Sequence, residues 1–97
     1  MSLRLVITFT ALPGKGADFA EAFRARAEAV MAEETGCLQY EVFRSAQEPD
    51  KVVLLEQWES QAALDEHFKV SQGRPRISEG FLAGPPSRED YEYARVS

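Results

Sequence analysis

Trp58 and His67 are the only tryptophan and the only histidine of this chain, and they lie close together in its sequence. A histidine titrates near neutral pH and can therefore accept or donate a proton in a reaction. A large aromatic beside it would provide an apolar wall, so the pair suits a small pocket for proton chemistry. Each residue also has a structural interpretation. Trp58 would then be a core or interface aromatic, and His67 a half-buried histidine that hydrogen-bonds the backbone or Glu56.

The segment 36–68 that contains this pair is predicted to form a strand, a turn, a second strand and a helix. Apolar residues recur over residues 38–43 and over 52–58, and the polar turn 45–50 between them predicts an antiparallel hairpin. Ser60 is typical of a helix N-cap, and residues 63, 64, 67 and 68 would share one face of the helix that follows. His67 is therefore expected to point inward.

The rest of the chain adds a strand and a helix before this segment and a strand after it. Residues 3–10 alternate as in a strand, and a helix is predicted to start near Asp18, with Glu21 completing a capping box. Its apolar face would carry Phe19, Phe23, Ala27, Val30 and Met31. The segment 71–75 is expected to interrupt the second helix, a short helical piece is predicted around residues 77–82, and a last strand over 91–96.

The predicted order βαββαβ indicates a ferredoxin-like α+β fold with a four-stranded antiparallel sheet, in one domain spanning residues 1–97. Residues 52–55 are all apolar, and Phe43 points opposite to Tyr40 and Val42, so both faces of the sheet look apolar. Two helices can cover only one face. We expect a second copy of the chain to cover the other face, giving a homodimer.

The composition excludes several classes of partner. The chain has 97 residues, a net charge of −5 and eleven Lys and Arg that are scattered singly, so nucleic acid and anionic membranes are not expected partners. The first residues alternate like a strand and do not resemble a targeting signal, and a cytoplasmic location is expected. Cys37 is expected to be a small buried thiol, and no spacing suggests a metal site.

Several short motifs of the chain resemble those of the antibiotic biosynthesis monooxygenase (ABM) domain. They are Gly36-Cys37-Leu38, the run from Tyr40 to Ser45, Glu56-x-Trp58, Ala63-Leu64 and His67. The resemblance spans nearly the whole chain. The resemblance implies a dimeric α/β barrel, and the family includes cofactor-independent monooxygenases of quinols and polyketide phenols, haem-degrading enzymes and an isomerase of a phosphorylated sugar.

The monooxygenase activity that this resemblance implies needs no metal, flavin or nicotinamide if the substrate becomes an electron-rich anion that reacts with oxygen. The protein must then remove a proton and hold the anion. His67 is the candidate catalytic base, and Trp58, Tyr40 and Arg44 are the candidate substrate-binding residues. The substrate would be a small aromatic or apolar molecule.

Two departures from the family narrow the expected activity. The chain has no asparagine, whereas the haem-degrading members use a pocket asparagine, so haem degradation is not expected. The isomerase branch has a tyrosine where Trp58 stands, and clustered basic residues for phosphate are not visible in the sequence. A sugar-phosphate isomerase and a non-catalytic ligand-binding or accessory barrel stay open as alternatives.

Overall fold

The structure of the chain is a computed structural model that describes residues 2–77 and 79–93. Its elements follow the order β1 (Ser2–Thr10), α1 (Gly16–Glu33), β2 (Cys37–Arg44), β3 (Lys51–Trp58), α2 (Gln61–Gln72) and β4 (Ser87–Tyr93). The predicted βαββαβ order and ferredoxin-like fold are thus confirmed. The predicted continuation of the last strand to residue 96 lies outside the described residues.

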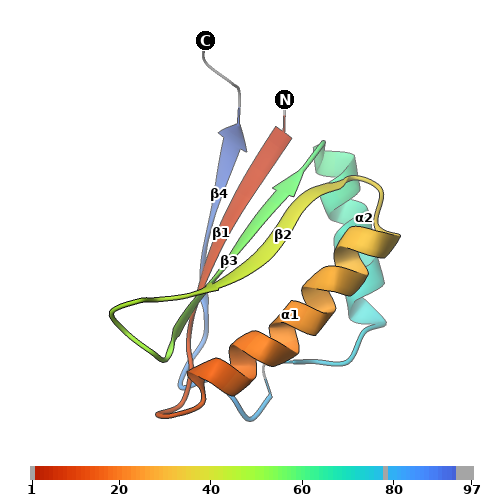
Figure 1. Cartoon of the computed structure of the whole chain (residues 1–97). Coiled ribbons are helices and arrows are strands. Elements are labelled where there is room, and N and C mark those ends of the chain that lie inside the picture. The colour runs from red at the N-terminus through yellow and green to blue at the C-terminus, as the bar shows by residue number, and fades with distance from the viewer. Residues whose placement is uncertain (1, 78, 94–97) are drawn as a thin grey trace.

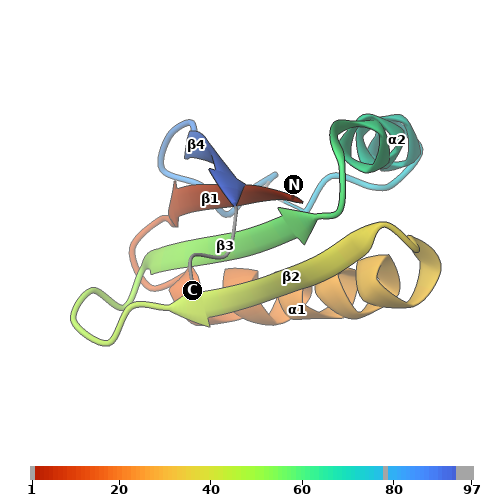
Figure 2. The same ribbon diagram turned by 90° about the horizontal axis from the view of Figure 1, so that it is seen from above.

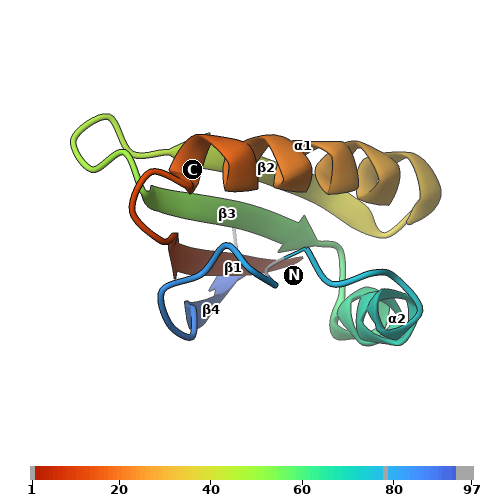
Figure 3. The ribbon, with the colours of Figure 1, turned by 90° about the horizontal axis from the view of Figure 1, so that it is seen from below.

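The four strands form one antiparallel sheet in the order β2-β3-β1-β4. Both helices lie on the same side of this sheet, with α1 along β2 and α2 near the end of β3 (Figure 1). The views from above and below agree with this arrangement, and neither described helix covers the opposite face (Figures 2 and 3). Neither helix is long and apolar enough to span a lipid bilayer.

The core lies between the sheet and the helices. Phe9 of β1 packs with Phe19 and Phe23 of α1, and their ring centroids are 5.1 to 5.5 Å apart. Such tilted and edge-on pairs stabilise a core beyond the area they bury. These contacts confirm the predicted faces of the first strand and the first helix. Met31, which was predicted on the same helical face, is 46% exposed.

The start of α1 differs from the prediction. The helix begins at Gly16, and its N-cap Lys15 makes no side-chain capping bond. Asp50, in the β2–β3 turn, instead accepts hydrogen bonds from the backbone N–H groups of Gly14 at 3.1 Å and Gly16 at 2.9 Å. The capping box at Asp18 is therefore wrong, because a carboxylate from a distant turn satisfies the helix terminus.

A close backbone contact accompanies this cap. A Cβ atom on Gly16 would lie 2.2 Å from the carbonyl oxygen of Pro49. Only glycine allows the hairpin turn to approach the helix start this closely. The β2–β3 turn and the beginning of α1 are thus held together by both hydrogen bonds and shape.

Strand β2 contains a β-bulge that sequence parity did not predict. Cys37 pairs with Trp58 and Gln39 pairs with Gln57, which leaves Leu38 as the extra residue. Leu38 is 51% exposed, while Tyr40 is buried. Regular strand alternation would place Leu38 and Tyr40 on the same face, but the bulge shifts the alternation by one residue.

The described residues of the segment after α2 return to the sheet without forming a helix. Ser71 belongs to the last turn of α2, so the predicted interruption comes later, at Gly73. The described residues between Gly73 and β4 form turns and bends, and Leu82 forms an isolated bridge with Ala11. The predicted helical piece around residues 77–82 is wrong because Phe81 and Leu82 pack on the end of β1 and the start of α1.

Candidate active site

Trp58 is the last residue of β3, and its ring is almost fully buried at 1% exposure. The indole Nε1–H donates a 2.8 Å hydrogen bond to Oε1 of Glu56, which points to the same face of the strand. Burial raises the pKa of Glu56 above its usual value of 4.5, and this hydrogen bond partly opposes the effect. Glu56 therefore serves Trp58, and not His67, as an acceptor.

His67 lies on the inner face of α2, as predicted, and is 6% exposed. Its ring packs on Trp58 with the ring centroids 4.5 Å apart. Nδ1 lies 2.8 Å from Oε1 of Glu34, and Nε2 lies 3.3 Å from Oγ of Ser71. Because a carboxylate only accepts, the neutral histidine carries its proton on Nδ1, and Nε2 can accept the hydroxyl hydrogen of Ser71.

Glu34 reaches His67 from the C-cap position of α1. It also lies 3.5 Å from a guanidinium nitrogen of Arg74, in the segment after α2. One buried carboxylate thus connects α1, α2 and the segment after α2. An imidazolium formed on His67 during a reaction would face this negative charge at close range.

Tyr40 joins the same cluster from β2. Its ring centroid is 5.6 Å from that of His67 and 6.4 Å from that of Trp58. Burial, reinforced by the carboxylate of Glu56, raises the pKa of the Tyr40 phenol, so this residue stays protonated at neutral pH. Three of the four predicted site residues therefore lie in mutual contact.

Arg44 is apart from this cluster. It pairs with Val52 at one end of the β2–β3 hairpin, whereas Trp58 pairs with Cys37 at the other end. Its side chain is exposed and lines a surface hollow beside α1 that contains Ala17 and Ala20. The structure thus does not bring Arg44 together with Trp58 and His67.

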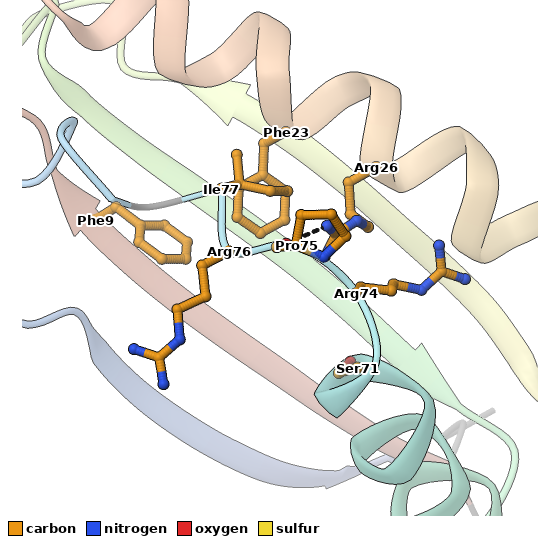
Figure 4. A pocket seen from close by; sticks show the side chains of 8 residues that line it. All are labelled: Phe9, Phe23, Arg26, Ser71, Arg74, Pro75, Arg76 and Ile77. Carbon is orange, nitrogen blue, oxygen red and sulfur yellow. Dashed lines mark hydrogen bonds between the residues drawn. The ribbon is translucent and has the colours of Figure 1, made fainter.

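Next to the histidine lies a pocket of about 320 Å³ between α1, β1 and the segment after α2. We call it the arginine pocket, and its lining residues are Phe9, Phe23, Arg26, Ser71, Arg74, Pro75, Arg76 and Ile77 (Figure 4). Its volume is at the lower end of those of small-molecule sites, which suits a ligand of one or two rings.

Ser71 is the residue that connects this pocket with the buried histidine. It lines the pocket, and its Oγ faces Nε2 of His67. A ligand hydroxyl placed against Ser71 can therefore exchange a proton with His67 although the imidazole itself is buried. The arrangement can perform acid–base chemistry on a small molecule.

The prediction from sequence missed Glu34, Ser71 and the arginines of the pocket. Ser71 had a local signal, because it lies four residues after His67 and such pairs are neighbours on a helix. Glu34 lies 33 positions before His67, and no local pattern links the two. Arg74 and Arg76 are two positions apart in the segment after α2, but Arg26 comes from α1, and no local pattern links it to them.

The remaining reactive groups have no comparable setting. Cys37 is buried, as predicted, and burial raises the pKa of its thiol to about 12, so the thiolate is not available at neutral pH. Within residues 2–77 and 79–93, no group of three His, Cys, Asp or Glu is arranged to hold a metal ion.

The sequence of the chain matches that of one known protein family. A family model described as "Antibiotic biosynthesis monooxygenase" matches residues 2–72. A search of curated protein sequences finds no match.

Solved structures give close matches over nearly the whole chain. One is a protein of Caulobacter crescentus CB15, which its name proposes to be an antibiotic biosynthesis monooxygenase. It is 30% identical to this chain, and the TM-score is 0.82. The match covers 97% of this chain and 91% of that one. A conserved protein of Methanosarcina mazei Go1 is 24% identical over 97% of this chain and 94% of its own, with a TM-score of 0.81, and shows the shared fold. A Pseudomonas aeruginosa protein is 26% identical over 97% and 95%, with a TM-score of 0.78.

Proposed function

The chain belongs to the antibiotic biosynthesis monooxygenase family, and we propose that it is a cofactor-independent monooxygenase of a small quinol or phenolic metabolite. The substrate lies in the arginine pocket with a ring hydroxyl against Ser71. One observation carries this proposal: the hydrogen-bonded order of Ser71, His67 and Glu34 joins the pocket to a buried base.

The first step is removal of the phenolic proton. Ser71 takes this proton from the substrate and passes its own hydroxyl proton to Nε2 of His67. The carboxylate of Glu34 stabilises the imidazolium that forms and keeps the ring oriented. The product of the step is an electron-rich phenolate held in a pocket with apolar walls.

Molecular oxygen then reacts with the phenolate. A C–O bond forms at a ring carbon that bears hydrogen, and His67 returns its proton to the outer oxygen to give a hydroperoxide. Loss of the C–H proton breaks the O–O bond, one oxygen atom stays as a quinone carbonyl, and the other leaves as water. The phenol supplies all four electrons, so the reaction needs no other reductant.

Trp58 and Tyr40 support the base in this proposal and do not hold the substrate anion. Trp58 donates its only side-chain N–H to Glu56, and burial keeps Tyr40 protonated. Their rings enclose His67 and exclude water, which strengthens the interaction of the imidazolium with Glu34. This assigns Trp58 and Tyr40 a positioning role, and it leaves no direct role for Arg44.

A non-catalytic ligand-binding protein is the second candidate. His67 is buried, and both of its ring nitrogens already face partners within the chain, as in a purely structural histidine. In that case the pocket would bind its ligand without turnover, and His67 would only join α1 to α2.

Oxygen uptake separates these two functions. The wild type is tested with a panel of quinols and anthrone-like phenols against His67→Ala and Ser71→Ala. We expect turnover that falls at least about 100-fold in His67→Ala and about 10-fold in Ser71→Ala. Thermal unfolding checks that each variant is folded. If His67→Ala does not fold, Ser71→Ala still tests the proposed proton transfer. Binding without turnover in the wild type, or equal turnover in the variants, would exclude the proposed role.

We also propose that the chain forms a homodimer through the face of the sheet that the helices leave open. The strand register and parity place Val6, Val53 and Leu55 on this open face, and Phe43 and Tyr91 beside them are each 46% exposed. An apolar sheet face of this kind is stabilised when a second copy covers it. Sedimentation that returns only monomer at micromolar concentration would contradict the dimer.

A further inference from the structure

The arginine pocket is positively charged although the chain as a whole is acidic. Three arginines line it, Arg26, Arg74 and Arg76, and no Asp or Glu is among its lining residues. The chain carries a net charge of −5. The pocket can therefore attract an anion, although the net negative charge of the protein repels one.

The three arginines differ in what they already bind. Arg26 donates to the carbonyl oxygen of Pro75, and Arg74 lies 3.5 Å from both Glu33 and Glu34. Within the described part of the chain, Arg76 forms no ion pair, and its side chain is exposed. Figure 4 shows the side chains of Arg74 and Arg76 pointing to opposite sides of the pocket. Arg76 is thus the arginine with its full set of donors available to a ligand.

One polar atom of Arg74 has no acceptor in the described part of the chain. Its Nε atom is buried and has no hydrogen-bond partner within the described residues. Buried N–H donors in folded proteins are nearly always paired, so this atom is an exception among the described residues. Because it is buried, a ligand of the pocket would meet the exposed donors of Arg76 first.

The other walls of the pocket are apolar and suit an aromatic ring. Phe9 and Phe23 come from the core side, and Pro75 and Ile77 come from the segment after α2 (Figure 4). A ring between these walls would have Ser71 within the same pocket as Arg76. One ligand can then offer a hydroxyl to Ser71 and an anionic group to Arg76.

We infer that the substrate is a small aromatic acid, a phenol or quinol with a carboxylate that Arg76 binds. The planar guanidinium of Arg76 matches a carboxylate with two parallel hydrogen bonds. This contact fixes the ring in one orientation and brings the hydroxyl to Ser71. The inference rests on the proposed function for the fate of the hydroxyl, whereas the carboxylate contact concerns binding alone.

Binding calorimetry without oxygen tests the contact. The probes are 2,5-dihydroxybenzoate and its neutral methyl ester, and the proteins are the wild type, Arg76→Gln and Arg24→Gln. Arg24 is the matched control because it is exposed, pairs with Glu21 and Glu28, and lies outside the arginine pocket. We expect the wild type to bind the acid at least about 10-fold more tightly than the ester, as for hydrogen bonds between charged groups.

In Arg76→Gln, affinity for the acid should fall about 10-fold to 100-fold, and affinity for the ester should not change. Arg24→Gln should bind both probes as the wild type does. Equal binding of acid and ester to the wild type overturns the inference, as does equal behaviour of the two variants or no binding of either probe.

Benzoate and phenyl phosphate form a second pair of probes. Stronger binding of phenyl phosphate than of benzoate would mean that Arg76 binds a phosphate ester and not a carboxylate.

Oxygen uptake with the same probes distinguishes this inference from the proposed function. Tight binding of the acid without oxygen uptake would contradict the monooxygenase activity but not the carboxylate contact. Equal turnover of unsubstituted hydroquinone and 2,5-dihydroxybenzoate would contradict the carboxylate contact but not the monooxygenase activity. The two statements can therefore fail separately.

Discussion

Oε1 of Glu34 lies 2.8 Å from Nδ1 of His67, and this contact joins the end of α1 to the inner face of α2. The two side chains are only 9% and 7% exposed, respectively. A buried carboxylate at this place determines which nitrogen of the histidine carries the proton. It also determines that the other nitrogen, beside Ser71, is the one available for chemistry.

Glu34→Gln should keep the hydrogen bond to His67 and remove the negative charge of residue 34. The amide oxygen can still accept from Nδ1, but it cannot stabilise an imidazolium, so we expect the turnover number to fall at least about 100-fold. Oxygen uptake between pH 5 and 9 measures the change. Glu33→Gln is the matched control, because Glu33 is 63% exposed and lies beside the same Arg74. Equal activity of the two variants would mean that Glu34 is only structural.

Asp50→Ala should destabilise the fold through the start of α1. Asp50 accepts from the backbone of Gly14 and Gly16, and loss of an N-terminal cap costs about 1–2 kcal/mol in the free energy of unfolding. Urea unfolding measures the loss. Asp18→Ala removes the residue that the sequence favoured as the cap, and it should cost less than about 0.5 kcal/mol. The reverse ranking would show that the capping partner has been assigned wrongly.

The burial of Glu56 predicts a dependence of stability on pH. Burial raises its pKa in the folded state, so the folded protein holds this proton more tightly than the unfolded chain does. Its contribution is most favourable below the usual pKa of 4.5 and is lost as the pH rises through the folded pKa.

Glu56→Gln should remove this dependence and keep an acceptor for Trp58. The variant should gain stability relative to the wild type as the pH rises above 4.5, by about 1.4 kcal/mol for each unit of the pKa shift. Urea unfolding from pH 4 to pH 8 tests it. A difference that is constant over this range would show that the carboxyl group does not titrate there.

Leu55→Lys should dissociate the proposed homodimer. Leu55 faces Val6 on the open face, and a charge there would have to be buried against the second copy. Sedimentation equilibrium at micromolar concentration should return monomer for this variant and dimer for the wild type. Met31→Lys places the same charge on an exposed apolar residue of α1 and should remain dimeric. If both variants behave alike, the open face is not the interface.

The sequence by itself determined the order of the elements and which residues of most elements point inward. Strand alternation, helical spacing and the cap at Ser60 are local properties, and Ser60 does accept from the backbone N–H of Ala63 as predicted. The same local rules placed His67 on the inner face of α2. The contact of Trp58 with His67 followed because β3 and α2 are consecutive elements.

Only the tertiary structure decided which partners these residues meet. Asp50 caps α1 from another turn, Glu34 reaches His67 from α1, and the bulge at Leu38 resets the alternation of β2. Each depends on strand register or on the path of a connecting segment, which long-range packing sets and local patterns do not encode. The arginine pocket has the same origin. Arg74 and Arg76 are close together in the sequence, but only the fold brings Arg26 of α1 beside them.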